Sequence, residues 1–463
     1  MKKKLLTIFL VGLGLIGLLV RFWQFGRIPL SLYWDEVAIG LDARSLLETG
    51  KDLNGKSWLQ PLFFSYGDYK APVYIWLVTL LGRFLSVSES TVRLPSLLAF
   101  LGTAWVLFQL IKILSPKKSL LPVFTLISLL IMPWSFHFSR IGMESHLSLF
   151  WLTLTVYLTI ASAKKNQPLQ IIFASIATVA GIYSYVSLRF LAPALLVISF
   201  FLYHRLKFKQ HLPYFLTGLT IILAGLFILA KSPYYAASQQ YRLSNDNLIN
   251  STIYLTKPAK AKQFLINYSA YFDPKFLLLS GDPNLRHHSG FGGELLLIQG
   301  IFLTAGLVAL LNYQRTETWL VLSWLFLSPA VAALVNETPH ASRAIYMMIP
   351  LAWLIGLGLT RFKPIISLAL VFALSLNLFI YLHNYFIHYP SQSALSWIMP
   401  YKQAALYFKD NPPQQPVYIS NQFYRPELYF AFYLNDLNLF KPNQKFYYYL
   451  PDICPESSIC VQK

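Results

Sequence analysis

Long apolar runs separated by short polar segments dominate the chain. The first is LLTIFLVGLGLIGLLV at 5–20. Ten further apolar windows follow at 93–114, 119–138, 146–163, 169–187, 190–204, 212–230, 291–311, 318–336, 344–360 and 364–386. A helix needs about 20 residues to cross a membrane, and several windows reach this length only with their interfacial ends. The pattern predicts an all-α integral membrane protein with about eleven transmembrane helices.

The first run has the features of an uncleaved anchor. Lys2, Lys3 and Lys4 precede it, as in a signal peptide, but no small-residue cleavage site follows. The run passes directly into Arg21-Phe22-Trp23, a cationic and aromatic sequence typical of the membrane interface. We therefore expect a multi-pass protein of the cell membrane, surrounded by membrane lipids, with its N-terminus in the cytoplasm.

Basic residues lie in small clusters between the apolar runs. The net charge is +19, although 56% of the residues are hydrophobic. Alternating spans put these clusters on the cytoplasmic side: Lys112, Lys117 and Lys118; Lys164 and Lys165; Arg205, Lys207 and Lys209; Arg315; Arg361 and Lys363. We interpret the charge as a topology signal. No nucleic-acid partner is expected, because that would need one continuous basic face.

The segment 71–87 is hydrophobic but does not fit as a span. Only about 11 of its residues precede Arg83, too few to cross a membrane. Counting it would also move every later basic cluster to the outside. We predict a juxtamembrane helix that lies in the interface.

This topology leaves three outward segments of appreciable length: 26–92, 231–290 and the tail from about 388. The cytoplasmic turns are all short, so none can form a nucleotide-binding domain. We expect a transmembrane domain at 1–387 and a small extracytoplasmic domain at 388–463.

The tail has the pattern of a small α/β element. PVYIS and KFYYYL are typical of strands, and YRPELYFAFYLND between them is typical of an amphipathic helix. Cys454 and Cys460 either close a small disulfide loop or remain two free thiols.

Two acidic neighbours, Asp35 and Glu36 in SLYWDEVAIG, follow the first span by a short distance. Anchoring does not require carboxylates here, so they indicate chemistry at the outer face. Adjacent side chains diverge by about 100° on a helix and point to opposite faces of a strand. The two cannot form the opposed pair of a glycosidase, so one of them faces the site. The alternative is a pair of solvated carboxylates or a helix cap.

The order of several motifs resembles a known family. These motifs are the basic N-terminus, YWDE, Lys70-Ala71-Pro72, ESTVRLPSLLAFLGT, FSRIGMES and YFDPKFLLLSGDPNLRHHSGFGGELL. Together they resemble the polyprenyl-phosphate-dependent membrane glycosyltransferases with the C-type fold, such as protein O-mannosyltransferases and lipid A aminoarabinose transferases. The resemblance covers about 10–360; the tail departs from it. Relatives often have two prolines after the basic residue, where this chain has Ala71-Pro72.

The resemblance implies inverting transfer of a monosaccharide from a polyprenyl phosphate to an extracytoplasmic lipid, glycan or protein. It places Asp35 at the acceptor as the base, with Glu36 beside it as a second catalytic candidate. The leaving phosphate needs cations around it. The outward candidates are Lys70, Arg140, Arg189 and Arg343.

Each cation also has a simpler explanation. Lys70 is explained equally well as a snorkelling lysine. Arg140 lies four residues before Glu144 and is placed to pair with it, although Glu144 is itself a candidate for substrate binding. Arg189 follows Tyr183 and Tyr185, which form either an interface belt or part of the substrate site.

Arg343 stands at the head of a predicted span and favours bidentate phosphate binding. His287, His288 and His340 are further candidates for substrate binding. Two adjacent histidines beside Asp282 rarely share one ion, so a polar loop lining the donor groove is favoured over a divalent metal site. No cofactor is expected.

Two other functions fit parts of the pattern. A flippase or transporter of lipid-linked sugars would keep its charged residues near the bilayer midplane, whereas here they cluster at one face. A polymerase or ligase acting on lipid-linked oligosaccharide would share much of the same surface.

Overall fold

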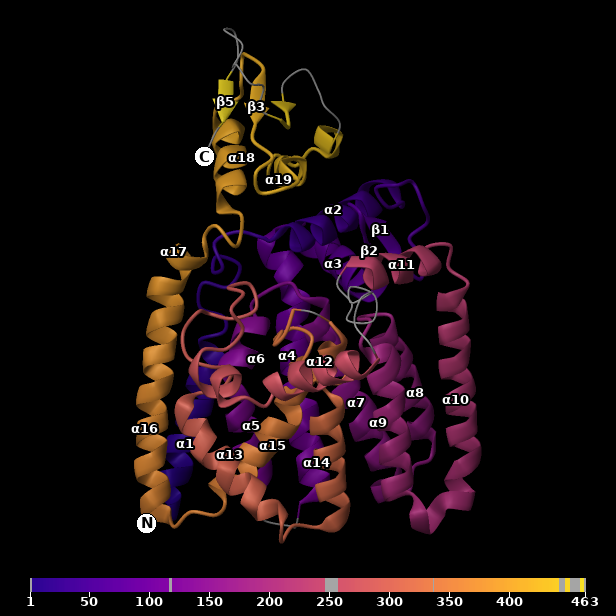
Figure 1. Cartoon of the computed structure of the whole chain (residues 1–463), viewed down its shortest axis with the longest axis vertical. Helices are drawn as coiled ribbons and strands as arrows, with labels where there is room; N and C mark the ends of the chain where they lie inside the picture. The colour runs from indigo at the N-terminus through magenta and orange to yellow at the C-terminus, as the bar shows by residue number, and fades with distance from the viewer. Residues whose placement is uncertain are drawn as a thin grey trace.

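The computed structural model describes residues 2–115, 119–245, 257–335, 337–440, 446–449 and 459–461. Lys117, Lys118 and Cys454 lie outside these ranges, as does the expected pairing of Cys454 with Cys460. Helices run up and down a bundle. A layer of shorter elements covers the end of the bundle that is drawn at the top of Figure 1, and we call this end the upper end.

The bundle contains a helix in each of the eleven predicted windows. They are α1 (Lys2–Leu19), α4 (Glu89–Leu114), α5 (Leu121–Leu130), α7 (Glu144–Lys165), α8 (Leu169–Ile182), α9 (Leu188–Tyr203), α10 (Phe208–Ala230), α13 (Leu297–Leu310), α14 (Arg315–Leu327), α15 (Met348–Leu359) and α16 (Pro364–His383). Single helical turns or short helices adjoin several of them: η1 (Arg205–Lys207), η2 (Lys275–Leu279), η3 (Ala332–Leu334), η4 (Ile345–Met347) and η5 (Asn384–His388).

Five described stretches are long and apolar enough to cross a membrane by length and composition: Glu89–Leu114, Glu144–Lys165, Arg205–Ala230, Arg315–Leu334 and Ile365–Ser393. The other apolar helices have 10–17 residues. The helical, apolar architecture agrees with an integral membrane protein. The number of eleven spans remains a prediction.

The window 119–138 is not one helix, as predicted, but two. α5 ends at Leu130, and α6 (Pro133–Phe138) begins with the proline. Proline has no N–H to continue the helical ladder and fits best in a first turn. The carbonyl of Leu130 accepts a hydrogen bond from Arg21 Nη2 at 2.8 Å instead.

Helices α13 and α15 approach each other most closely at glycines. A Cβ added to Gly306 would lie 1.9 Å from the Leu354 carbonyl oxygen, and one added to Gly358 would lie 1.9 Å from that of Phe302. Close backbone contact through small residues is how helices associate in membranes. These contacts hold α15 in the bundle centre, where every one of its residues is buried.

The upper layer begins with α2 (Trp34–Thr49). The antiparallel strands β1 (Phe63–Ser65) and β2 (Asp68–Lys70) follow, and then α3 (Pro72–Leu85). α3 confirms the helix expected at 71–87, and its place in the interface remains a prediction. The second outer segment adds α11 (Tyr235–Asn245) to this layer, and its α12 (Lys257–Ala270) lies lower, at the level of α6 (Figure 1).

The C-terminal unit begins with α17 (Tyr389–Ser393) and α18 (Met399–Asp410). β3 (Val417–Ile419), α19 (Pro426–Tyr433), η6 (Leu437–Phe440), β4 (Phe446–Tyr447) and β5 (Ile459–Val461) follow. The elements β3, α19 and β4 lie at the positions of the expected strand, helix and strand. β5 was not predicted; it pairs in parallel with β3 on the side opposite β4.

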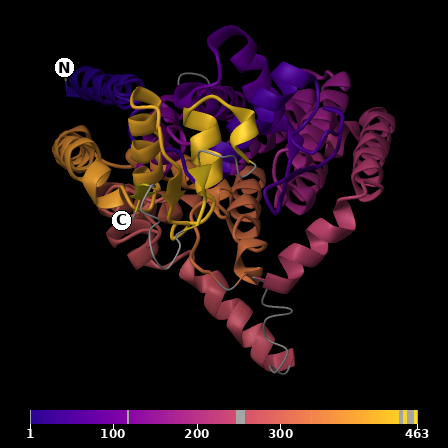
Figure 2. The same cartoon turned by 90° about the horizontal axis from the view of Figure 1, so that it is seen from above.

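This unit packs on α2 rather than standing apart. Residues of α2 and α19 belong to one hydrophobic cluster. Tyr429 Oη donates to the Leu32 carbonyl at 3.1 Å, and Lys402 Nζ donates to the Glu89 carboxylate at 2.9 Å. Figure 2 shows the unit lying across the upper end of the bundle.

Candidate functional site

The acidic pair lies in the first turn of α2, where the helix N-terminus favours negative charge. The two side chains diverge as helix geometry requires. The Glu36 side chain is completely buried, whereas the Asp35 side chain is 31% exposed. Asp35 therefore faces the open side of the turn, and Glu36 faces the bundle.

The hydrogen bonds of Glu36 hold neighbouring parts of the chain in place. Its carboxylate accepts hydrogen bonds from the backbone N–H of Gly142 at 2.6 Å and of Tyr33 at 3.0 Å. Arg93 Nε donates to it at 3.1 Å. Because these partners surround a buried carboxylate, the geometry favours a positioning role over the catalytic role expected for Glu36.

Arg93 is the charged partner of Glu36, and the sequence reading did not single it out. Its guanidinium also donates to the carbonyls of Gly26 at 3.2 Å, Pro29 at 2.9 Å and Ser31 at 2.6 Å. The signal was present: a lone arginine near the start of the apolar window 93–114. It fixes the chain that leads into the Asp35 turn.

Lys70, at the end of β2, forms an ion pair with Asp35. The Lys70 side chain is only 2% exposed, and its Nζ lies 5.5 Å from the centre of the Trp34 ring. Burial alone would lower the pKa of Lys70, but Asp35 and then Asp68 and Glu144 raise it above its ordinary value. The ammonium therefore stays charged. Its burial contradicts the snorkelling alternative.

Glu144 lies in the first turn of α7. The negative charge of its carboxylate raises the pKa of Lys70, as do the charges of Asp35 and Asp68, and so favours the charged ammonium. Candidates that lie far apart in the sequence, Asp35, Lys70 and Glu144, are thus brought to one place at the upper end.

Arg286 reaches the same turn from the second outer segment, and the sequence reading missed it. Its guanidinium carbon lies 3.9 Å from the centre of the Tyr33 ring. Asn284 Oδ1 accepts from Arg286 Nε at 3.1 Å, which fixes the side chain. Burial raises the pKa of Tyr33; the charge of Arg286 lowers it and the charge of Asp35 raises it.

The position of Arg140 argues against the phosphate-binding role expected for it. The residue is fully buried. Its guanidinium donates to the backbone carbonyls of Arg21 at 2.6 Å, Gln24 at 3.2 Å and Ile28 at 3.4 Å. Because its donors hold the chain after α1, we assign Arg140 a positioning role.

Arg189 is the second residue of α9, and its guanidinium carbon lies 5.6 Å from the centre of the Tyr235 ring. Tyr183 donates its hydroxyl to the Gly225 carbonyl at 2.9 Å, and its own carbonyl accepts from Val73 N at 3.3 Å. Tyr183 thus ties α8 to α10 and α3. Tyr185 lies in the turn between α8 and α9, half-buried beside the main core.

Arg343 lies just before η4, and its side chain is 23% exposed. Its Nη2 is 3.9 Å from a Glu337 carboxylate oxygen. Its Nη1 is buried and has no hydrogen-bond partner among the described residues. A buried donor without an acceptor is costly, so this guanidinium is suited to receive an anion.

The three candidate histidines separate into two groups. His288 Nδ1 accepts from Gly290 N at 3.0 Å, and its Nε2 is 3.4 Å from the Gly293 carbonyl oxygen, so it braces its own loop. His287 and His340 come from different loops, and their ring centres are 4.2 Å apart. Asp282 lies beside them, with Oδ2 3.3 Å from His287 Nδ1.

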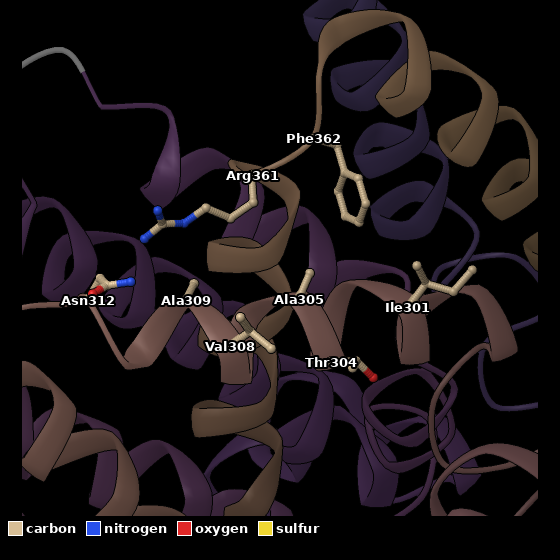
Figure 3. Close-up of a pocket in the computed structure, with 8 residues that line it drawn as sticks. All are labelled: Ile301, Thr304, Ala305, Val308, Ala309, Asn312, Arg361 and Phe362. Carbon is tan, nitrogen blue, oxygen red and sulfur yellow. The ribbon is translucent and has the colours of Figure 1, made fainter.

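A groove of about 610 Å³ lies at the lower end of the bundle, away from these residues. Figure 3 shows its lining, mostly apolar side chains of α13 with Arg361 and Phe362. It contains no carboxylate, so its size carries no argument for catalysis.

Comparison with known proteins places this geometry in context. Residues 69–229 match the sequence profile of the dolichyl-phosphate-mannose-protein mannosyltransferase family. This segment includes Lys70, Arg140, Glu144 and Arg189. No curated protein matches the chain in sequence.

Solved structures match over nearly the whole chain. ArnT from Cupriavidus metallidurans, bound to undecaprenyl phosphate, matches with a TM-score of 0.61 and 12% identity, over 93% of this chain and 84% of that one. The oligosaccharyltransferase AglB from Archaeoglobus fulgidus, with an inhibitory peptide and a dolichol-phosphate, matches with a TM-score of 0.54 and 13% identity, over 94% of this chain and 64% of that one. The chain thus has the fold of these membrane proteins, which confirms the expected C-type architecture.

Proposed function

We propose that this protein transfers a monosaccharide from a polyprenyl-phosphate-linked donor to an acceptor outside the cytoplasm. The observation that carries the proposal is the ion pair of Asp35 with buried Lys70, approached by Glu144 and Arg286. The matched mannosyltransferase profile and the lipid phosphates bound to ArnT and AglB support it.

In this mechanism the acceptor hydroxyl binds beside Asp35. Its oxygen attacks the anomeric carbon while Asp35 removes the proton. A new carbon–oxygen bond forms as the bond to the lipid phosphate breaks, and the electron pair leaves on the phosphate. Attack from the face opposite the leaving group inverts the configuration.

Cationic side chains stabilise the departing phosphate. Lys70 can exchange part of its interaction with Asp35 for the phosphate, since an ammonium carries three donors. Arg343 offers the buried Nη1 that lacks a partner among the described residues, and Arg286 approaches from the same loop as His287. Arg189, Tyr185 and His340 remain candidates for contact with the donor.

The proposed topology has an N-terminus in the cytoplasm and a C-terminal unit outside it. Cysteines introduced one at a time at the exposed positions 51 and 424 should react with an impermeant reagent in intact cells, and one near 208 should not. Labelling at 208 from outside would refute this topology.

The direct test of the function is reconstitution in liposomes with a panel of synthetic polyprenyl-phosphate sugars, followed by mass spectrometry of the products. A product that carries one added sugar supports the proposal. Movement of the intact donor across the membrane without a product would support a flippase, and transfer of a whole oligosaccharide would support a ligase.

A further inference from the structure

We propose that Asp282, His287 and His340 together bind one divalent transition-metal ion, with zinc as the ion that best fits the donor set. The site joins the loop between η2 and α13 to the loop between η3 and η4. It is separate from the proposed sugar transfer, which needs no metal at this place.

The distances suit zinc. The possible ligand atoms of the three residues all lie within 4.8 Å of one another. Zinc bonds to histidine nitrogen and carboxylate oxygen are about 2.0–2.2 Å, so two ligands of a tetrahedral ion lie roughly 3.3–3.6 Å apart. Asp282 Oδ2 and His287 Nδ1 already have this spacing, at 3.3 Å. The widest pair needs to close by about 1.5 Å, which a small side-chain rotation supplies.

The three residues are also buried and incompletely bonded. Their exposed fractions are 3%, 6% and 7% for Asp282, His287 and His340. His287 Nδ1 and His340 Nδ1 are both buried with no hydrogen-bond partner among the described residues. The 3.3 Å contact with Asp282 therefore does not satisfy His287. Two unpaired ring nitrogens beside a carboxylate are costly unless an ion accepts their lone pairs.

Backbone groups hold the carboxylate in place. Ala341 N donates to Asp282 Oδ2 at 2.7 Å, and Asn284 N donates to Oδ1 at 2.8 Å. Each oxygen keeps a second lone pair for an ion. Hydrogen bonds of this kind orient metal ligands in known sites.

The adjacent His288 takes no part, because both of its ring nitrogens face backbone groups of its own loop. The site therefore does not arise from the sequence motif of two neighbouring histidines. It arises because the fold brings His340 from another loop against the ring of His287.

Two nearby cations, Arg286 and Arg343, weaken the attraction for an ion, and Glu337 partly offsets them. Its carboxylate lies 3.8 Å from His340 Nε2 and 3.9 Å from Arg343 Nη2. Two imidazoles and one carboxylate favour zinc over magnesium or calcium, which prefer oxygen ligands throughout. The ion would connect the two loops that carry Arg286 and Arg343.

The test measures zinc in the full-length protein, purified in detergent with an affinity tag that contains no histidine. After dialysis against metal-free buffer with equimolar zinc added back, inductively coupled plasma mass spectrometry should find about one zinc per chain. His340→Ala and Asp282→Asn should each weaken zinc retention by at least about tenfold, since even outer partners of metal ligands contribute this much.

The matched control is His388→Ala, because His388 is an exposed histidine outside the cluster. It should keep the wild-type zinc content. Cobalt added to the metal-free wild-type protein should give the strong visible absorption of a four-coordinate site, and a variant that fails to fold does not affect this measurement. The proposal is overturned if the wild type retains no zinc, if His388→Ala loses as much as His340→Ala, or if cobalt shows only the weak spectrum of the hydrated ion.

Discussion

Two sets of cations in this protein differ in what their donors reach. Arg21, Arg93 and Arg140 donate to backbone carbonyls of the chain between α1 and α2 or at the break after α5. Arg93 also pairs with Glu36, whose carboxylate is completely buried. Lys70 and Arg343 do not meet buried carboxylates; their partners Asp35 and Glu337 are 31% and 59% exposed. Arg343 also keeps a buried donor without a partner among the described residues. We call the first set the anchor arginines and the second the site cations.

The difference teaches that burial alone does not identify a ligand-binding cation. An arginine whose donors are occupied by carbonyls stabilises the fold, and a phosphate could reach it only by breaking those bonds. A cation paired with a partly exposed carboxylate can exchange partners at lower cost, because water solvates the carboxylate that it releases.

The variant with the largest expected effect on stability removes one of the anchor arginines. Arg93→Met leaves Glu36 as a buried, unpaired carboxylate, which typically costs about 3–5 kcal/mol of unfolding free energy. Denaturation in mixed micelles should show this loss. Lys363→Met, which removes an exposed cation from the start of α16, should change stability little. Equal stability of the two variants would mean that Arg93 is not an anchor.

A pH effect tests the hairpin that presents Lys70. Burial is the main cause that raises the pKa of Asp42 from 3.8 to about 7. The hydrogen bond that Ser65 donates to its carboxylate lowers this pKa and so opposes part of the rise. Because the pKa of Asp42 is higher in the folded state, the proton on its carboxyl group stabilises the folded protein. This stabilisation is full below pH 3.8 and is lost as the pH rises through about 7. Stability should fall by about 1.4 kcal/mol per pH unit across this window.

The measurement is the melting temperature in detergent between pH 5 and 8. Asp42→Asn should remove the slope, whereas Asp410→Asn, at an exposed carboxylate of α18, should keep it. A wild-type slope retained in Asp42→Asn would place the titrating group elsewhere.

The smallest effect concerns Arg343 as a site cation. Arg343→Lys keeps the charge but loses the planar fork that binds phosphate through two hydrogen bonds. The apparent KM for the lipid-phosphate donor should rise by an amount equivalent to about 1–3 kcal/mol, as for a lost charge-assisted hydrogen bond. The melting temperature should not change. An unaltered KM would make Arg343 an interface anchor.

The sequence was informative where the information is local. Apolar windows predicted a helix in every place where the bundle has one, because each window carries its own hydrophobic signal. Pro133 was a local signal for the break between α5 and α6, but the continuous apolar run on both sides of it led to the prediction of a single helix. The strand, helix and strand of the tail were predicted from short periodic patterns, while β5 was not predicted.

The site was less predictable, because its residues are defined by partners far along the chain. Asp35 and Lys70 were named separately, but only the fold shows that they pair. Arg140 was expected at the phosphate because its carbonyl partners between Arg21 and Ile28 have no sequence signature. His287 was considered with its neighbour His288, whereas its true neighbour in space is His340.

The most direct test of the account is the transfer rate of Asp35→Asn, measured together with donor binding on the same reconstituted protein. Asparagine keeps the shape of the side chain but cannot accept the acceptor's proton. The rate should fall by about 10²–10⁴-fold, the usual effect of losing a general base, and donor affinity should be retained. A variant that binds the donor and transfers sugar at the wild-type rate would contradict the assignment of Asp35 as the base.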